Sequence, residues 1–199
     1  MTESQARPAP EDLLGLRVIA HPLRLQLLSL LTGSAMSAAE AARHLGQSQA
    51  NVSYHLRRLH AAGLVEVAGH EVVRGGRAVR YRHASSSGQR LSAQDPADEA
   101  ALVAALGAEL SRRTAERDPD GDGAFTDAEV WVGEDTWGQV LELVRQAGAL
   151  LHEGARAPRS EGTRRVSALL YAFEMLPGPD PAGPDDHDGP ALEDPRAGE

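Results

Sequence analysis

The chain has 199 residues, which is enough for one domain of ordinary size or for a small domain with an appendage. It contains no cysteine, which excludes disulfides and thiolate metal sites, and its 4% of aromatic residues implies a core made mainly of Leu, Val and Ala. No apolar run approaches the roughly 18 residues that span a bilayer, and the N-terminus lacks a secretory signal. We therefore expect a soluble cytoplasmic protein with no membrane partner.

The net charge of −9 is distributed unevenly along the chain. Between Arg17 and His83 there are nine Arg and three Glu residues, a balance of +6, and the remainder carries −15. A basic module inside an acidic chain is typical of a protein in which one face binds phosphates while the rest repels them.

The N-terminal part predicts a short disordered segment and two helices. Residues 1–11 hold two Pro and few apolar residues, so we expect them to be disordered. Residues 12–20 are predicted as a helix that His21-Pro22 interrupts. Pro22 suits the first turn of a second helix, residues 22–32, whose leucines form a core face. We expect Arg24 on this helix to form an ion pair or to contact phosphate.

Two further helices follow, joined by a short glycine-containing turn. Residues 37–45 begin with a Ser-x-x-Glu capping box and stop at Gly46. Residues 48–62 begin with Ser48 as N-cap and stop at Gly63. Helix, short turn, helix is the arrangement in which the second helix enters a DNA major groove.

The helix predicted over 48–62 has two different faces. Val52, Leu56 and Leu59 recur at helical spacing and should point into a core. The other face has amides, hydroxyls and guanidinium groups and no carboxylate, which favours contact with DNA. Its members are Gln49, Asn51, Ser53, Tyr54, Arg57 and Arg58.

A cationic hairpin is predicted after this helix. Short β-branched runs lie on both sides of Arg74-Gly-Gly-Arg77, which predicts two strands and a tight turn within residues 64–82. Arg74, Arg77 and Arg80 are candidates for phosphate or minor-groove contacts, because guanidinium suits both. The alternative is a solvated hairpin that merely carries charge.

Residues 12–83 together resemble the winged helix-turn-helix of ArsR-type bacterial transcriptional regulators. The resemblance rests on His21-Pro-Leu-Arg24, on the capping-box helix, and on SQANVSYHLRRLHAAGLV from Ser48 to Val65. It implies a winged-helix fold, double-stranded DNA as partner, and repression of a nearby promoter. Metal sensors of this family often carry Cys ligands in the helix that corresponds to residues 37–45. That helix has none here, so sensing of thiophilic metals is not expected.

The C-terminal part predicts a linker, a helical and α/β region, and an acidic tail. Residues 95–176 are expected to serve dimerisation or to bind an effector whose identity the sequence does not specify. The segments in order are a linker (84–94), a long helix (95–117), an acidic loop (118–127), a strand (129–132), an amphipathic helix (134–156), a strand (165–173) and a disordered tail (177–199).

The acidic loop fits the calcium-binding EF-hand pattern. Asp118, Asp120, Asp122 and Glu129 stand at the ligand positions, with Gly123 at the sharp turn. An EF-hand needs its last ligand on an exiting helix, whereas Glu129 opens a predicted strand, and there is no second EF-hand. A flexible acidic loop that matches by chance is the preferred interpretation.

The remaining chemistry of the sequence favours a binding protein over an enzyme. Neither His152-Glu153 nor the acidic run around His187 shows paired histidines at helical spacing, and no nucleophile motif, Walker loop or dinucleotide fingerprint occurs. No cofactor is therefore expected.

The fold class that follows is mainly α with small β. A winged helix-turn-helix domain is followed by a long helix and a small strand-helix-strand C-terminal appendage. The function that follows is a sequence-specific regulator of transcription, a dimeric repressor that binds a palindromic operator. The alternative is an interaction or sensor protein that acts through its C-terminal region, with or without calcium.

Overall fold

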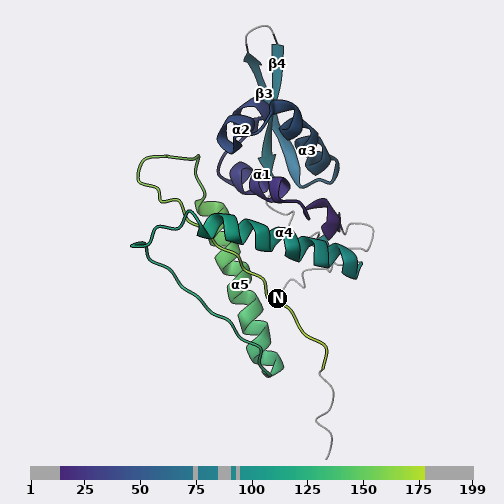
Figure 1. The fold of residues 1–199 in the computed structure, drawn as a ribbon, viewed down its shortest axis with the longest axis vertical. Helices are drawn as coiled ribbons and strands as arrows, with labels where there is room; N and C mark the ends of the chain where they lie inside the picture. The colour runs from purple at the N-terminus through teal and green to yellow at the C-terminus, as the bar shows by residue number, and fades with distance from the viewer. Residues whose placement is uncertain (1–13, 74–75, 85–90, 93–94, 178–199) are drawn as a thin grey trace, which may run out of the picture.

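The computed structural model describes residues 14–73, 76–84, 91–92 and 95–177 (Figure 1). It is mainly α with a small antiparallel sheet, as the sequence predicts. In chain order its elements are β1 (Leu14–Gly15), η2 (Leu16–Val18), α1 (Pro22–Gly33), β2 (Met36–Ser37), α2 (Ala38–Leu45), α3 (Gln49–Ala61), β3 (Val65–Val73), β4 (Gly76–His83), β5 (Leu91–Ser92), α4 (Pro96–Thr114) and α5 (Glu134–Gly154).

The predicted hairpin is confirmed as β3 and β4. It pairs from Val65 with His83 out to Val73 with Gly76, and β2 joins the other edge of β4. The register shifts between Val67 and Gly69, where Gly69 has a φ of 154°. Such a bulge bends a hairpin and increases its twist. In Figure 1 the hairpin projects beyond the helices as a wing.

The capping signals of the sequence are confirmed at α2 and α3. The Ser37 hydroxyl accepts from the Glu40 N–H at 3.3 Å, and the Glu40 carboxylate accepts from the Ser37 N–H at 2.7 Å. Gly46 ends α2 with a φ of 63°, a left-handed conformation that suits glycine. Ser48 then caps α3 by accepting from the Asn51 N–H at 3.2 Å. The two helices therefore have fixed ends and a fixed turn between them.

One hydrophobic core holds these elements together. Its fully buried side chains come from α1, α3 and the start of β3, and they are aliphatic, as the scarcity of aromatic residues predicts. The largest of them are Leu27, Leu31, Val52, Leu56, Leu59, Leu64 and Val65. The burial of Val52, Leu56 and Leu59 confirms the core face predicted for α3.

α4 packs against this core rather than apart from it. Leu102 belongs to the same buried cluster and is 5% exposed. Glu109, 2% exposed, is bound by Arg112 at 3.0 Å and Arg113 at 3.6 Å of its own helix, and by Gln26 of α1. α4 is thus attached to the winged-helix core by an apolar contact and by a buried polar one.

The helix predicted over residues 12–20 is wrong where the structure describes that range. Leu14–Gly15 is a strand that pairs in parallel with Leu91–Ser92, and Leu16–Val18 is a single 3₁₀ turn. A short segment before a proline gains few α-helical hydrogen bonds. Burial of Leu16 and Ile19 in the core decides its conformation instead.

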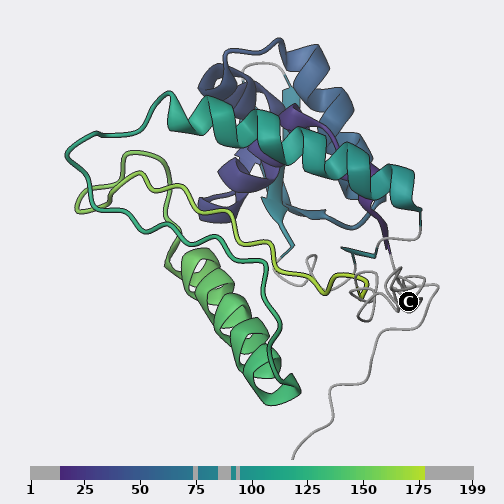
Figure 2. The ribbon, with the colours of Figure 1, turned by 60° about the horizontal axis from the view of Figure 1, so that its bottom comes forward.

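The strands predicted on either side of α5 are also wrong. Residues 128–133 and 164–177 have no regular secondary structure and pair with no strand in the described chain. Their β-branched and aromatic residues suit a sheet, but β propensity depends on a neighbouring strand. The strand-helix-strand appendage is therefore reduced to α5, which extends away from the winged-helix body (Figure 2).

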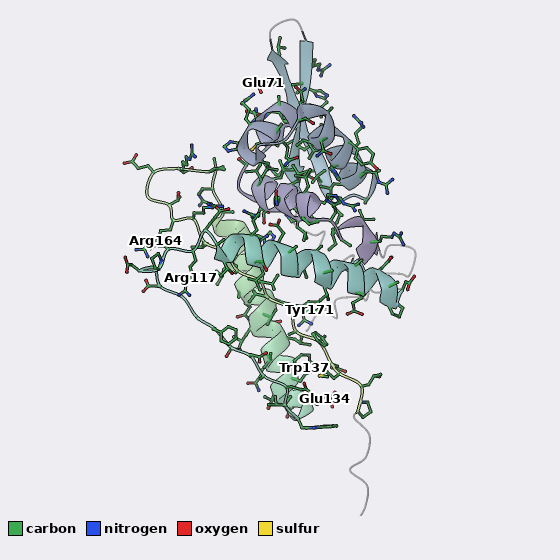
Figure 3. The ribbon with its side chains drawn as sticks, viewed as in Figure 1. Glu71, Arg117, Glu134, Trp137, Arg164 and Tyr171 are labelled. Atoms are coloured by element: carbon green, nitrogen blue, oxygen red, sulfur yellow. The ribbon has the colours of Figure 1, made fainter. Side chains whose placement is uncertain are left out.

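Polar side chains attach the segment after α5 to α4. Arg165 donates to Glu116 at 2.6 Å and Tyr171 donates to Glu99 at 2.8 Å. Because Glu116 lies near the C-terminal end of α4 and Glu99 near its start, the segment runs antiparallel to α4. Trp137 at the start of α5 then donates to Glu174 at 2.7 Å (Figure 3). Among the helices that the structure describes, none is long and apolar enough to cross a membrane.

Candidate nucleic-acid interface

α3 turns its polar side outward, as a recognition helix requires. Gln49, Asn51, Arg57 and Arg58 are exposed, and Tyr54 is 51% exposed. Ser53 is partly buried. The structure therefore brings the polar residues expected from the sequence to the surface of one helix that contains no carboxylate.

Contacts at both ends of α3 hold it in place. At its start the Asn51 side chain donates to Gln47 at 3.2 Å, which orients the amide in addition to the Ser48 cap. At its end His60 donates from Nδ1 to the Val65 carbonyl at 3.0 Å, and its ring lies 5.9 Å from that of Tyr81 on β4. α3 and the wing are thus positioned relative to each other by direct contacts.

The wing arginines divide into exposed and internally bound ones. Arg77 and Arg82 on β4 are exposed, and β4 places Arg77 next to the tip of the hairpin. Arg74 lies outside the described residues. Among the described wing arginines, Arg77 and Arg82 are therefore available to a ligand, and Arg77 lies nearer the tip.

Arg80 is held by acceptors within the chain. Its guanidinium donates to Glu71 at 2.7 Å, to Glu40 at 3.2 Å, and to the carbonyl of Ala35. The bond to Glu71 raises the pKa of Arg80, although burial opposes this. Burial would raise the pKa of Glu40, but its hydrogen bonds from Ser37 and the charge of Arg80 hold that pKa below its usual value. Arg80 thus connects the wing to α2 and to the end of α1.

The acidic loop does not assemble a cation site. Asp118 accepts from the N–H of Asp120 at 3.1 Å, and Asp122 lies 3.9 Å from Arg164. Asp120 and Glu129 are exposed, and Glu129 lies in a segment without regular secondary structure. Across the described ranges no group of three or more His, Asp or Glu side chains converges in a way that could hold a metal ion.

Sequence reasoning did not identify a cluster where α1 begins. His21 and Arg24 of α1 lie against His55 of α3, and the two imidazole centroids are 4.6 Å apart. The available signal was the His21-Pro-Leu-Arg24 run, but the sequence does not show that it lies beside the middle of α3.

The comparisons with known proteins agree with this geometry. Residues 19–68 match the family model of a helix-turn-helix domain. No curated protein matches the chain. Three solved structures are similar to about half of this chain. They are the transcriptional repressor BigR from Xylella fastidiosa (21% identity, 52% of this chain and 84% of that one, TM-score 0.31), reduced HlyU from Vibrio cholerae (25%, 50% and 82%, 0.30), and a possible transcriptional regulator for arsenical resistance (32%, 52% and 95%, 0.29).

The matched range covers α1, α2, the turn and α3, and the β3–β4 hairpin follows it directly. The chain thus carries a helix-turn-helix domain, and the β3–β4 hairpin that follows it completes a winged helix-turn-helix fold.

Proposed function

We propose that the protein is a sequence-specific repressor of transcription that binds a palindromic operator as a homodimer. The observation that carries the proposal is the exposed, carboxylate-free face of α3 within a helix-turn-helix whose ends and turn are fixed by caps. Residues in the first turns of such a helix lie deepest in the major groove.

The exposed residues then fall into two groups. Gln49, Asn51 and Ser53 lie in the first turns of α3, and their amide and hydroxyl groups can bond to base edges. Tyr54, Arg57, Arg58 and the wing residue Arg77 supply contacts to the phosphate backbone, which position the protein without reading sequence. We assign Arg80 the role of a wing anchor, because three internal acceptors already occupy it.

The C-terminal region supports the homodimer. α5 is amphipathic in sequence but has no buried residue in the single chain. Large apolar side chains around it are exposed as well, including Trp131 at 87% and Leu150 at 71%. Monomeric proteins rarely expose apolar surface on this scale. A second copy of the same region would bury it and would align two recognition helices on one DNA duplex.

A hollow at the base of the wing is the candidate effector site. It has a volume of about 300 Å³, within the range of small-molecule sites. It lies between the end of α1, the base of the wing and the end of α5, and its lining residues are Thr32, Glu66, Arg82, His83, Ala84, His152 and Glu153. A ligand there would contact the wing and the proposed dimerisation helix together.

The test is to select DNA from a random pool with the full-length protein and then to measure binding by fluorescence anisotropy. A bidentate contact to a base contributes roughly 1–3 kcal/mol of discrimination, so Gln49→Ala should weaken binding to the selected duplex about 5- to 150-fold. Affinity for random DNA should be unchanged, because it depends on the arginines.

Ser29→Ala on α1 is the matched control, since Ser29 is exposed and lies outside α3, the wing and α5. It should leave both affinities as they are. If a folded Gln49→Ala, Ser53→Ala double variant keeps the preferred sequence and its affinity, α3 does not read the major groove. The exposed C-terminal region would then become the functional part, as the alternative holds.

A further inference from the structure

The start of α1 and the middle of α3 form a cluster of basic side chains. His21 is the N-cap of α1 and accepts at Nδ1 from the Leu23 N–H at 3.1 Å. Its Nδ1 therefore carries no proton in this arrangement. The ring of His55 lies 4.6 Å from that of His21, and the ring of Tyr54 stands edge-on to His55 at 5.2 Å.

Two nitrogens of this cluster are buried without a hydrogen-bond partner in the described residues. His55 is 7% exposed, and its Nδ1 has no partner. The Nε of Arg24, one turn into α1, is in the same state. Buried polar atoms in native structures nearly always have a partner, so two unpartnered nitrogens on side chains that interact electrostatically point to a group from outside the described chain that completes the site.

Among the described residues, the groups that shift the pKa values of these side chains are basic, apart from Tyr54, which raises the pKa of Arg24. Burial and the charge of Arg58 lower the pKa of Arg24. Burial lowers the pKa of His55, and His21, Arg24 and Arg58 lower it further. Burial and Arg24 also lower the pKa of His21. No carboxylate contributes to any of these shifts, whereas Arg80 and Arg112 each have two carboxylate partners.

The position of the cluster, between a helix N-terminus and the side of α3 assigned to DNA, favours an anionic ligand. The N-terminus of α1 adds the positive end of a helix dipole. Arg58 and Tyr54 are exposed on the side of α3 assigned to DNA, so they connect the buried nitrogens to the surface that would face a duplex. A tetrahedral oxyanion supplies both the hydrogen-bond acceptors and the negative charge that these nitrogens lack.

We propose that Arg24, Tyr54 and Arg58, with His55 beneath them, hold one phosphate of the DNA backbone. The proposal rests on the proposed function and extends it to α1, which clamps the strand while the first turns of α3 read bases. A phosphate beside His55 favours its protonated form, so DNA binding takes up a proton. Affinity should therefore increase as the pH falls toward the range in which His55 of the free protein becomes protonated, and then level off.

The first experiment measures binding of random and selected duplexes by the full-length protein across a salt series. Arg24→Gln should weaken both duplexes by the same factor and reduce the slope of log K against log salt by about 0.9, the value for one phosphate contact. Arg17→Gln is the matched control, because Arg17 is exposed and lies 3.5 Å from Asp98 of α4. An unchanged slope in folded Arg24→Gln overturns the proposal.

The second experiment uses the unsubstituted protein, so it does not depend on the folding of a variant. The pKa of His55 is measured by NMR in sodium chloride, in sodium sulfate at equal ionic strength, and with duplex bound. A rise with both sulfate and duplex supports the proposal, whereas no rise with duplex overturns it. If duplex never binds, the proposed function itself fails, and a rise with sulfate alone reassigns the site to a free oxyanion.

Discussion

At the scale of single residues, the arginines of the wing look equivalent in sequence but differ in their surroundings. Arg77 is exposed, whereas the guanidinium of Arg80 has acceptors on β3, on α2 and before β2. A guanidinium with such partners stabilises the fold and is poorly placed to bind phosphate. Charge counting along the sequence cannot separate these two roles, because the acceptors of Arg80 come from distant segments.

Arg80→Ala should lower the free energy of unfolding, while Arg77→Ala should not. Hydrogen bonds between charged groups contribute roughly 1.5–3 kcal/mol when well shielded, and the partial exposure of Arg80 reduces the expected loss to about 1–2 kcal/mol. Arg77→Ala should change stability by less than about 0.5 kcal/mol and weaken binding to all DNA sequences alike. Urea unfolding and DNA titration of both variants test this. Equal stability losses would contradict it.

His83 makes stability depend on pH. Burial and, to a smaller extent, the charge of His152 lower its pKa from 6.5 to about 4. Between these pH values the unfolded chain binds more protons than the folded one. The stabilisation that comes from a neutral His83 is therefore complete above about pH 6.5 and is lost as the pH falls toward 4. At roughly 1.4 kcal/mol per pKa unit, the loss is at most about 3.5 kcal/mol.

The measurement is urea unfolding at pH 7.5 and at pH 5 or below. His83→Gln should lose less stability on acidification than the unsubstituted protein, while the same change at the exposed His44 should leave the difference unaltered. Some acid sensitivity should remain in His83→Gln, because the pKa values of His21 and His55 are lowered too. An identical acid loss in His83→Gln would exclude this role.

At the scale of elements, sequence reasoning succeeded where the determinants are local. Ser37 with Glu40, Ser48 and Gly46 are caps that act within a few residues, and the spacing of Val52, Leu56 and Leu59 defines one helix face. The strands expected at 129–132 and 165–173 failed, because a strand needs a partner that the sequence does not specify. The basic cluster at His21 was missed for a similar reason, since it joins two helices.

The attachment of α4 to α1 depends on Glu109, which no local pattern indicated. Burial raises its pKa, but hydrogen bonds from Arg112 and Gln26 hold the pKa below its usual value, so it remains a carboxylate. Glu109→Ala should lower the free energy of unfolding by about 1–3 kcal/mol, less than for a fully buried pair because Arg112 is partly solvated. Glu116→Ala, at an exposed position just after the same helix, is the control and should change stability little. Comparable effects in urea unfolding would argue against this role.

At the scale of the whole molecule, one part of the chain buries its apolar side chains and the other leaves them exposed. The winged-helix core is closed and buried, while the region around α5 exposes most of its large apolar side chains. The two approach each other closely at the end of α1: a Cβ added at Gly33, the last residue of α1, would lie 2.1 Å from the carbonyl oxygen of Arg156. A movement of α5 would therefore displace the end of α1, which lies beside the hollow at the base of the wing.

The last prediction is that the exposed face of α5 forms the dimer contact. Leu143 and Leu150 are 65% and 71% exposed. They are seven residues apart, about two turns, so they lie on the same face of α5. Leu143→Asp with Leu150→Asp should convert a dimer into a monomer in sedimentation equilibrium, and it should leave the unfolding of the winged-helix core unchanged, because both side chains are exposed and no residue of α5 is buried. Val72→Asp, at an apolar wing position that is 88% exposed, is the control for assembly.

The DNA affinities should change in parallel. A dimer that places two copies of α3 about one helical turn apart, roughly 34–36 Å, gains affinity from both half-sites of a palindrome. The monomeric variant should therefore lose affinity for the full palindrome and keep its affinity for a single half-site. An unsubstituted protein that is monomeric at micromolar concentration, both free and on DNA, would refute the dimer. The apolar surface of α5 would then have to serve a different partner.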